Sequence, residues 1–156
     1  MEMQPSTITE ETFQQVLDLF WESIPPAWGR IRANLRAIAA EQFDITIEQF
    51  QILRHIRKGL HSASELAAEK RISRPAISQA IDLLVAKGLI TRRQDASDRR
   101  FVTLDLTQEG NNILNTIFDE NRVWMREKLS LLNPEELQIL ASALTLVKKS
   151  FIDSLN

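Results

Sequence analysis

The first part of the chain carries hydrophobic residues at helical spacing. One stripe contains Phe13, Val16, Leu17, Phe20, Trp21 and Ile24, and a second contains Ala27, Ile31, Leu35 and Ile38. Such spacing predicts amphipathic helices across residues 8–44. Pro25 and Pro26 lie between the two stripes, and we expect them to interrupt the helix, because proline cannot donate a backbone hydrogen bond.

Two further helices are marked by capping pairs. Thr46 precedes Gln49 by three positions, and Ser62 precedes Glu65 by the same spacing. In each pair the two side chains can satisfy each other's backbone N–H groups at the start of a helix. The pattern predicts a helix that begins near residue 47 and a short second helix that ends near residue 70.

A third helix follows after a turn of three residues. Ser73 is a suitable N-cap, Pro75 falls in the first turn, where a missing N–H costs little, and Gly88 can end the helix. Two short helices joined by a tight turn form a helix-turn-helix.

The hydrophobic period then changes from that of a helix to that of a strand. The segments LITRRQ and RRFVTLDL can pair as antiparallel strands, with DAS at the tip of the hairpin between them. A helix-turn-helix followed directly by such a hairpin is a winged helix, and we expect it to occupy residues 45–106.

Residues 107–156 return to helical spacing. Thr107 is a suitable cap for a long helix, and Asn133 followed by Pro134 opens a last one. The expected fold class is mainly α with a small β-wing. It is a winged helix-turn-helix flanked by N- and C-terminal dimerisation helices, in a single domain that spans 1–156.

The charge along the chain is distributed unevenly. The formal net charge is −2, yet residues 70–104 contain eight lysine or arginine and three aspartate residues, a local charge of +5. The remainder therefore carries −7. A basic middle between acidic ends is typical of a surface that attracts nucleic acid. A solvated surface of mixed charge is the alternative that composition alone leaves open.

The predicted wing carries four arginines, Arg92, Arg93, Arg99 and Arg100. Arginine binds phosphate with a planar fork, and it suits the narrow, electronegative minor groove of A·T-rich DNA. Asp98 can hold a neighbouring arginine in place or cap the turn. A wing that grips DNA explains why an otherwise acidic chain gathers these cations.

In the order and spacing of these segments, the sequence resembles the MarR (multiple-antibiotic-resistance regulator) family of winged-helix proteins. ITIEQFQIL is similar to the opening of that family's second helix, SELAAEKRISRPAISQAIDLLVAKGLITR to its helix-turn-helix and first wing strand, and DASDRR with LDLTQEG to its wing tip and return strand. The resemblance covers residues 45–110. It implies a homodimeric transcriptional regulator, usually a repressor, that a small and often aromatic or phenolic ligand releases from double-stranded DNA.

The helix from about residue 74 to 87 is the expected recognition helix. Its inward face should hold Ile77, Ala80, Ile81 and Leu84. The expected DNA contacts on its outer face are Arg74, Pro75, Ala76, Ser78 and Gln79. Gln79 can pair bidentately with adenine, and Arg74 can reach guanine or phosphate. Asp82 has three interpretations: it can accept from cytosine, lie beside a phosphate that it repels, or form an intramolecular ion pair.

The terminal helices are expected to form a dimer interface, because one chain cannot bury both of their apolar stripes. The predicted interface residues are Phe13, Leu17, Leu140, Leu144, Val147 and Phe151. A twofold dimer implies a pseudo-palindromic operator. A monomer whose first and last helices close on themselves is the alternative.

The ligand pocket of the resembling family tends to lie where the dimer helices meet the winged helix. Trp28, Arg32 and His55 are the candidates in this sequence, since an aromatic wall with a cation suits an aromatic acid. The alternative interpretation is that Trp28 belongs to the core and that the other two side chains are solvated.

Other kinds of site have little support. The chain has no cysteine, which excludes disulfides and zinc–thiolate sites. His55 and His61 would need carboxylates such as Glu65 or Glu69 to bind a metal, so we expect no metal and no cofactor. No phosphate loop, GxSxG or HExxH motif appears, and the sequence therefore predicts no enzyme.

The sequence also bears on location and on the remaining alternative. No apolar run is long enough to span a membrane, and the acidic N-terminal segment lacks the pattern of a signal peptide, so a cytoplasmic protein is expected. The second candidate function is a dimeric winged-helix module that binds protein and not DNA. The clustered wing arginines favour DNA, because a protein adaptor has no need of them.

Overall fold

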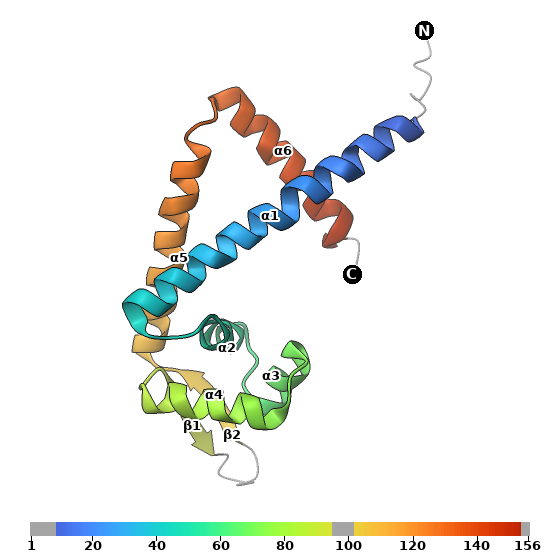
Figure 1. The fold of residues 1–156 in the computed structure, drawn as a ribbon. Coiled ribbons are helices and arrows are strands. Elements are labelled where there is room, and N and C mark those ends of the chain that lie inside the picture. Colours follow the sequence, from blue (N-terminus) through green and yellow to red (C-terminus); the bar gives the residue numbers. More distant parts are fainter. Residues whose placement is uncertain (1–8, 95–101, 154–156) are drawn as a thin grey trace. The chain divides into compact units, whose positions relative to one another are not determined.

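The structure, a computed structural model, describes residues 9–94 and 102–153. The order of elements is α1 (Glu10–Phe43), α2 (Ile47–Arg57), α3 (Ala63–Lys70), α4 (Arg74–Ala86), β1 (Ile90–Gln94), β2 (Val102–Leu106), α5 (Gln108–Leu129) and α6 (Pro134–Phe151) (Figure 1). The predicted class, mainly α with a small β-wing, is confirmed. The chain forms two compact units, Met1–Ile117 and Phe118–Asn156. The single domain expected over 1–156 stays a prediction.

Helix α1 is continuous over 34 residues, and the predicted interruption at Pro25 and Pro26 is wrong. Each proline removes one N–H, so the carbonyl groups of Trp21 and Glu22 lose their helical donors. The side chains of this part of α1 are exposed. Water can therefore hydrogen-bond to the two carbonyl groups, and the helix continues. It ends at Asp44, which adopts a left-handed conformation with φ of 51°.

Helices α2 and α3 begin at the two predicted capping pairs. The Thr46 hydroxyl accepts a hydrogen bond from the Gln49 N–H (3.1 Å), and the Gln49 side chain accepts one from the Thr46 N–H (2.9 Å). Ser62 and Glu65 make the same reciprocal pair, at 3.2 and 2.9 Å. Gly59, just beyond α2, has φ of +102°, which an L side chain rarely adopts.

The winged-helix part of the first unit is built around one hydrophobic core. Figure 1 shows α2, α3, α4 and the hairpin close to one another. Side chains that are almost fully buried come from each of these elements, namely Leu53, Ile56, Leu66, Ile77, Ile81, Leu84, Ile90 and Leu104. In α4 the buried residues share one helical face, as predicted, although Ala80 is only half-buried. The opposite face of α4 is left at the surface.

The wing is a two-stranded antiparallel sheet. Its register pairs Ile90 with Leu106 and Gln94 with Val102. The outer edge of β2 is also tied to the helical part, because the Leu104 N–H donates to the His61 carbonyl (2.8 Å). The base of the wing is thereby held against the segment that precedes α3.

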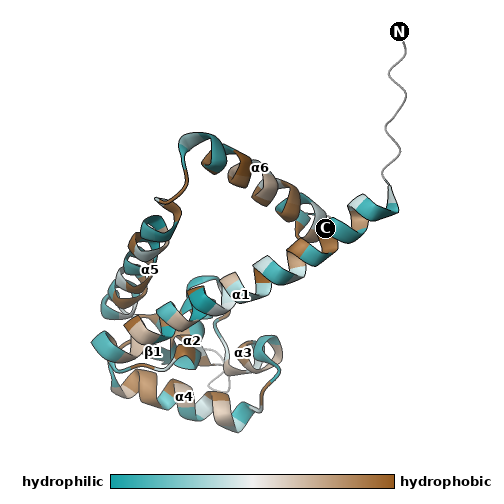
Figure 2. Ribbon diagram, turned by 45° about the horizontal axis from the view of Figure 1, so that its top comes forward, coloured by the Kyte–Doolittle hydropathy of each residue, from teal (hydrophilic) through white to brown (hydrophobic). Residues whose placement is uncertain are grey.

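The last two helices begin at their predicted caps. The Thr107 hydroxyl accepts a hydrogen bond from the Gly110 N–H (3.0 Å) at the start of α5. At the start of α6 the Asn133 side chain accepts one from the Glu136 N–H (2.9 Å), with Pro134 in the first turn. None of the side chains of α6 is buried. Figure 2 shows brown, hydrophobic segments along this helix.

Candidate nucleic-acid interface

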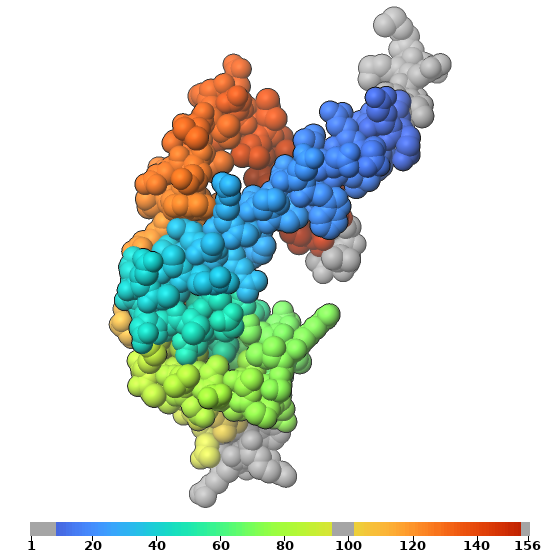
Figure 3. All heavy atoms as spheres, viewed as in Figure 1, coloured from blue at the N-terminus to red at the C-terminus, as the bar shows by residue number. Residues whose placement is uncertain are grey.

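The outer face of α4 carries the side chains predicted to read DNA. Ser73 caps the helix by accepting a hydrogen bond from the Ala76 N–H (3.4 Å). The exposed residues of this face include Arg74, Pro75, Ala76 and Gln79, while Ser78 is half-buried. In the space-filling view α4, in yellow-green, lies at the surface (Figure 3). A helix about 10–12 Å across fits a major groove about 12 Å wide.

The turn between α3 and α4 adds a basic residue that sequence reasoning did not select. Arg71 ends α3 in a left-handed conformation with φ of 53°, and its N–H donates to the carbonyls of Ala67 and Ala68. A non-glycine residue in this conformation is uncommon. The signal was present in the sequence, because the three-residue turn RIS contains no glycine that could take the left-handed position. Arg71 is exposed and lies three positions before Arg74, the first residue of α4.

Two of the predicted wing arginines are held by carboxylates at the base of the hairpin. The Arg92 guanidinium lies 2.6 Å from the Asp82 carboxylate, which joins β1 to α4. The Arg93 guanidinium lies 2.9 Å from the Asp105 carboxylate on β2. The intramolecular ion pair, one of the three interpretations of Asp82, is present in the structure. The predicted tip residues Asp98, Arg99 and Arg100 lie outside the described residues.

His61 joins the same carboxylate from the helical side. Its Nδ1 lies 2.9 Å from the Leu104 carbonyl oxygen, which can only accept, so this nitrogen carries the hydrogen. The same Nδ1 is 3.8 Å from Asp105. His61, Asp105 and Arg93 therefore link the segment before α3 to both wing strands.

A hollow lies between the wing and the helix-turn-helix. Its volume is about 400 Å³, and its walls are Ala63, Ile81, Arg92, Gln94, Val102 and Leu104. One cation stands among mostly apolar side chains there. The hollow lies beside the recognition helix, since Ile81 belongs to α4 and Arg92 pairs with Asp82 on the same helix.

The three candidate ligand residues, Trp28, Arg32 and His55, differ in their exposure. Trp28 is 52% exposed and does not belong to the buried core of its own unit. Arg32, one turn further along α1, is half-buried, and its Nε is buried without a hydrogen-bond partner among the described residues. His55 on α2 is also half-buried.

The electrostatic surroundings connect Arg32 and His55 through Lys70. Burial lowers the pKa of His55, and the charge of Lys70 lowers it further. Burial also lowers the pKa of Lys70; the charge of Glu48 opposes this shift, and the charge of Arg32 adds to it. The Lys70 ammonium donates to the Gln51 side chain (2.6 Å). Arg32 of α1 and Lys70 of α3 thus share a partly buried region with His55 of α2, which is suited to an anion.

The predicted dimer residues are at the surface of their own units. On α1, Phe13 is 55% and Leu17 is 48% exposed; on α6, Leu144 is 51% and Phe151 is 59% exposed. Leu140 and Val147 are half-buried. Large apolar side chains that repeat along an exposed helix face mark a surface that binds another protein surface.

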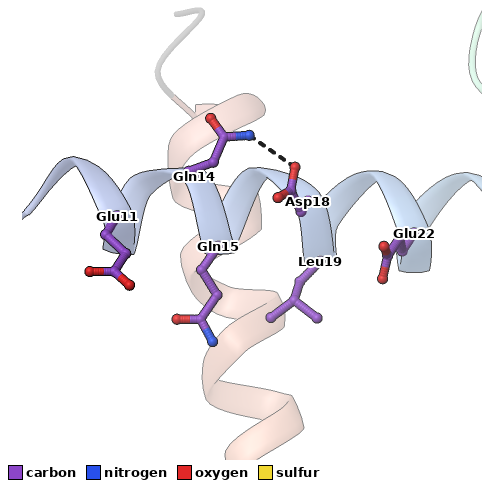
Figure 4. A pocket seen from close by; sticks show the side chains of 6 residues that line it. All are labelled: Glu11, Gln14, Gln15, Asp18, Leu19 and Glu22. Atoms are coloured by element: carbon purple, nitrogen blue, oxygen red, sulfur yellow. Dashed lines mark hydrogen bonds between the residues drawn. The ribbon is translucent and has the colours of Figure 1, made fainter.

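Charged side chains accompany both apolar faces. The N-terminal part of α1 has a shallow, acidic hollow lined by Glu11, Gln14, Gln15, Asp18, Leu19 and Glu22, in which Gln14 donates to Asp18 (3.0 Å) (Figure 4). In the second unit a groove of about 580 Å³ at the α5–α6 elbow is lined by Arg122, Met125, Arg126, Leu129, Ser130 and Leu137. The first surface is acidic and the second is basic.

Within residues 9–94 and 102–153, no group of three or more histidine, aspartate and glutamate side chains is arranged to hold a metal ion. In the same part of the chain, no helix has the length and hydrophobicity needed to cross a membrane.

Known proteins share this sequence pattern and this fold. The model of the MarR family matches residues 43–100. Over 98 residues the chain is 31% identical to the HTH-type transcriptional repressor MdtR of Bacillus subtilis, an alignment that covers 62% of this chain and 63% of that protein. The fold is similar to that of transcriptional regulator Tm0710 from Thermotoga maritima, with a TM-score of 0.75, 20% identity, and coverage of 94% of this chain and 98% of that one. It is also similar to Streptococcus pneumoniae FabT in complex with DNA, with a TM-score of 0.65, 19% identity, and coverage of 92% and 99%.

Proposed function

The chain belongs to the MarR family of winged-helix, DNA-binding transcriptional regulators, which are not enzymes, and from that premise we propose that it acts as a homodimeric repressor controlled by a small aromatic anion. In this proposal each subunit places α4 in a major groove and its wing against the neighbouring backbone. The anion lowers the affinity of the dimer for its operator.

The observation that carries the DNA-binding part of the proposal is the surface of α4. Three buried residues, Ile77, Ile81 and Leu84, fix the rotation of the helix about its axis. With that rotation Gln79 is exposed on the outer face, and Arg74 is exposed at its start. Gln79 would supply the base contact and Arg74 a contact to guanine or phosphate.

The wing would contribute more to the overall affinity for DNA than to sequence specificity. Arg92 and Arg93 are already paired with carboxylates, so they are better suited to orient the hairpin than to bind phosphate at full strength. Arg99 and Arg100 at the tip are the arginines that we assign to the phosphate backbone or the minor groove.

Exposed apolar faces on α1 and α6 support the homodimer. The apolar side chains of Phe13 and Leu17 on α1, and those of Leu144 and Phe151 on α6, would be costly to leave in water. Charge complementarity supports the same pairing, because the acidic hollow of α1 and the basic elbow groove at Arg122 can meet across two copies.

An aromatic anion is the effector class that the region around Arg32 would accept. Trp28 offers an exposed ring, and Arg32 offers a buried Nε whose hydrogen-bond donor is unused among the described residues. An incoming carboxylate would satisfy that donor. It would also stabilise the charged form of His55, whose pKa is lowered by burial and by Lys70. The sense of control, repression, is taken from the name of the relative MdtR.

The proposal is tested by selection of duplexes from a random DNA pool with the purified protein. The expected result is a pseudo-palindromic site with half-sites about 10 base pairs apart, bound by two subunits. Salicylate, as the probe for the effector class, should lower the affinity for that site. Retention of the whole pool without enrichment would contradict sequence-specific binding.

The same selection decides the second candidate function, a winged-helix module that binds protein. The ion pairs of Arg92 and Arg93 favour this candidate slightly, because they remove two cations from the face that would meet DNA. It becomes the better proposal if the protein shows no affinity for duplex DNA even at low salt.

A further inference from the structure

The C-terminal end of the recognition helix is hydrogen-bonded to two residues that are remote in sequence, one at the end of α1 and one before the start of α5. On one side the Lys87 ammonium donates to the carboxylate of Asp44 (2.7 Å) and to its main-chain carbonyl (2.5 Å). On the other side the Thr107 hydroxyl donates to the Gly88 carbonyl (2.7 Å), and the Thr107 N–H donates to the Leu89 carbonyl (3.1 Å). Asp44 ends α1, and Thr107 begins α5.

The attachment to α5 is rigid. Gly110 lies so close to the Leu89 main chain that a Cβ at this position would overlap the carbonyl oxygen. Backbone hydrogen bonds and this close approach leave little freedom between α4 and the start of α5. The direct attachment to the end of α1 is different, because its hydrogen bonds come from the single side chain of Lys87.

We propose that Lys87 is a positioning residue for DNA recognition, and that its contact with Asp44 sets the angle of α4 relative to α1. This inference rests on the proposed function, in which α4 reads the major groove. Lys87 itself lies at the end of the helix away from Arg74, so it acts on the DNA contact through the helix. A helix of this length is about 20 Å long, so a rotation of about 5° at Lys87 displaces the first turn by between 1 and 2 Å. A shift of that size removes hydrogen bonds to base edges.

The contact is poorly suited to a purely structural role. The Asp44 side chain is 99% exposed and that of Lys87 is 32% exposed, and ion pairs of this kind contribute little to the free energy of unfolding. Asp44 also occupies a left-handed backbone conformation, in which glycine would be more favourable. An aspartate at this position is therefore unfavourable for the backbone, while its carboxylate and carbonyl hold Lys87.

Substitutions of Asp44 and Lys87 distinguish an effect on the position of α4 from an effect on the stability of the fold and from a change in net charge. Asp44→Gly removes the carboxylate, leaves the main-chain carbonyl as the remaining acceptor for Lys87, and relieves the backbone, so the melting temperature should stay the same or rise. Loss of an acidic group alone would strengthen binding to every duplex. Loss of the contact between Lys87 and Asp44 should instead weaken binding to the selected duplex. Lys87→Met keeps the aliphatic stem and removes both hydrogen bonds. Lys87→Arg keeps a donor, and Lys58→Met removes an exposed lysine elsewhere in the same unit as the matched control.

The first measurement is made without DNA. Because the chain has no cysteine, nitroxide labels can be attached at Arg36→Cys on α1 and Gln79→Cys on α4, and labelled chains diluted into an excess of unlabelled protein. The distance distribution between the labels should shift or broaden in Asp44→Gly and Lys87→Met, and it should stay as in the wild type in Lys87→Arg and Lys58→Met. Identical distributions in all five proteins would overturn the proposal.

The second measurement compares the affinities of unlabelled variants for the selected duplex and for a scrambled duplex of the same composition. Asp44→Gly and Lys87→Met should lower the ratio of the two affinities about three- to tenfold, and Lys87→Arg should restore it. An unchanged ratio in both variants would overturn the proposal even if the label distances change. The label distances can change as expected while none of the proteins, wild type included, prefers any duplex. In that case the proposed DNA-binding function fails, and the role of the Lys87–Asp44 contact in setting the angle between α1 and α4 stands.

Discussion

The Arg92 guanidinium on the first wing strand lies 2.6 Å from the Asp82 carboxylate on α4. This ion pair joins the two elements that the proposal brings to DNA, the recognition helix and the wing. It also withholds one cation from the phosphate backbone. Arg92 can therefore fix the angle of the wing or bind DNA, but it cannot do both at full strength.

Removal of Asp82 should separate these two roles. In Asp82→Ala the freed Arg92 becomes available to phosphate, so binding to scrambled DNA should strengthen, with a salt slope steeper by about 1 for each additional phosphate that the protein neutralises. Discrimination between selected and scrambled duplexes should fall, because the wing is no longer tied to α4. Asp119→Asn, an exposed carboxylate on α5, is the control for the change in net charge. If salt titrations give Asp82→Ala and Asp119→Asn the same affinities and the same salt slopes, the ion pair does not have this role.

The proposed dimer can be tested on its exposed apolar residues. Leu144→Asp and Phe151→Asp each place a carboxylate in the expected interface, where an unpaired charge should weaken dimerisation about 100-fold or more, equivalent to about 3 kcal/mol. Ile72→Asp, an exposed apolar residue in the turn between α3 and α4, should leave the mass unchanged. Light scattering across a concentration series measures the mass. A wild-type protein that stays monomeric at micromolar concentration would rule out the homodimer.

The effector region can be tested by tryptophan fluorescence. Salicylate should quench the emission of Trp28 and lower the affinity for the selected duplex over the same concentration range, because a ligand can act only by preferring one state of the protein. Trp28→Phe should remove the quenching, whereas Trp21→Phe should retain it. Arg32→Gln should weaken salicylate binding. If salicylate and its analogues leave DNA affinity unchanged, this class of effector is wrong while DNA binding can stand.

The pH dependence of stability should contain a contribution from His55. Burial and the charge of Lys70 lower the pKa of His55 in the folded state, while the unfolded chain has a pKa of about 6.5. Below about pH 6.5 the unfolded chain therefore binds more protons, and stability falls as the pH falls toward the folded pKa. Urea unfolding at pH 7.5 and 5.5 should show a smaller acid-induced loss in His55→Gln than in the wild type. An equal loss in the two proteins would contradict the assignment.

Local signals allowed much of the fold to be predicted from the sequence. The reciprocal bonds of Thr46 with Gln49 and of Ser62 with Glu65 depend on residues three positions apart, so their spacing is enough to place the starts of α2 and α3. The change of hydrophobic period likewise located the wing. The prediction of an interruption at Pro25 and Pro26 was wrong. The free-energy cost of the two missing N–H donors depends on whether water reaches the carbonyl groups that lose them, and the sequence does not reveal this.

The less predictable features depend on contacts between distant residues. Lys87 and Asp44 are 43 positions apart, and nothing in the local pattern of either residue indicates the other. The ion pair of Arg92 with Asp82 was one of three interpretations of Asp82, and it depends on the placement of β1 beside α4. Arg71 is a different case, because its signal is local: the turn RIS contains no glycine, so a residue with a side chain takes the left-handed position.

The measurement that tests the account most directly is a salt titration of the wild type, Gln79→Ala and Arg99→Ala on selected and scrambled duplexes. Gln79→Ala should weaken binding to the selected duplex by about 1–3 kcal/mol for each base that Gln79 reads, with little change on the scrambled one. Arg99→Ala should weaken binding to both duplexes and flatten the salt slope by about 1 for each phosphate that is no longer neutralised, which is doubled across a dimer. If both variants keep the wild-type affinity and slope on both duplexes, neither α4 nor the wing contacts DNA as proposed, and the protein-binding module becomes the better account.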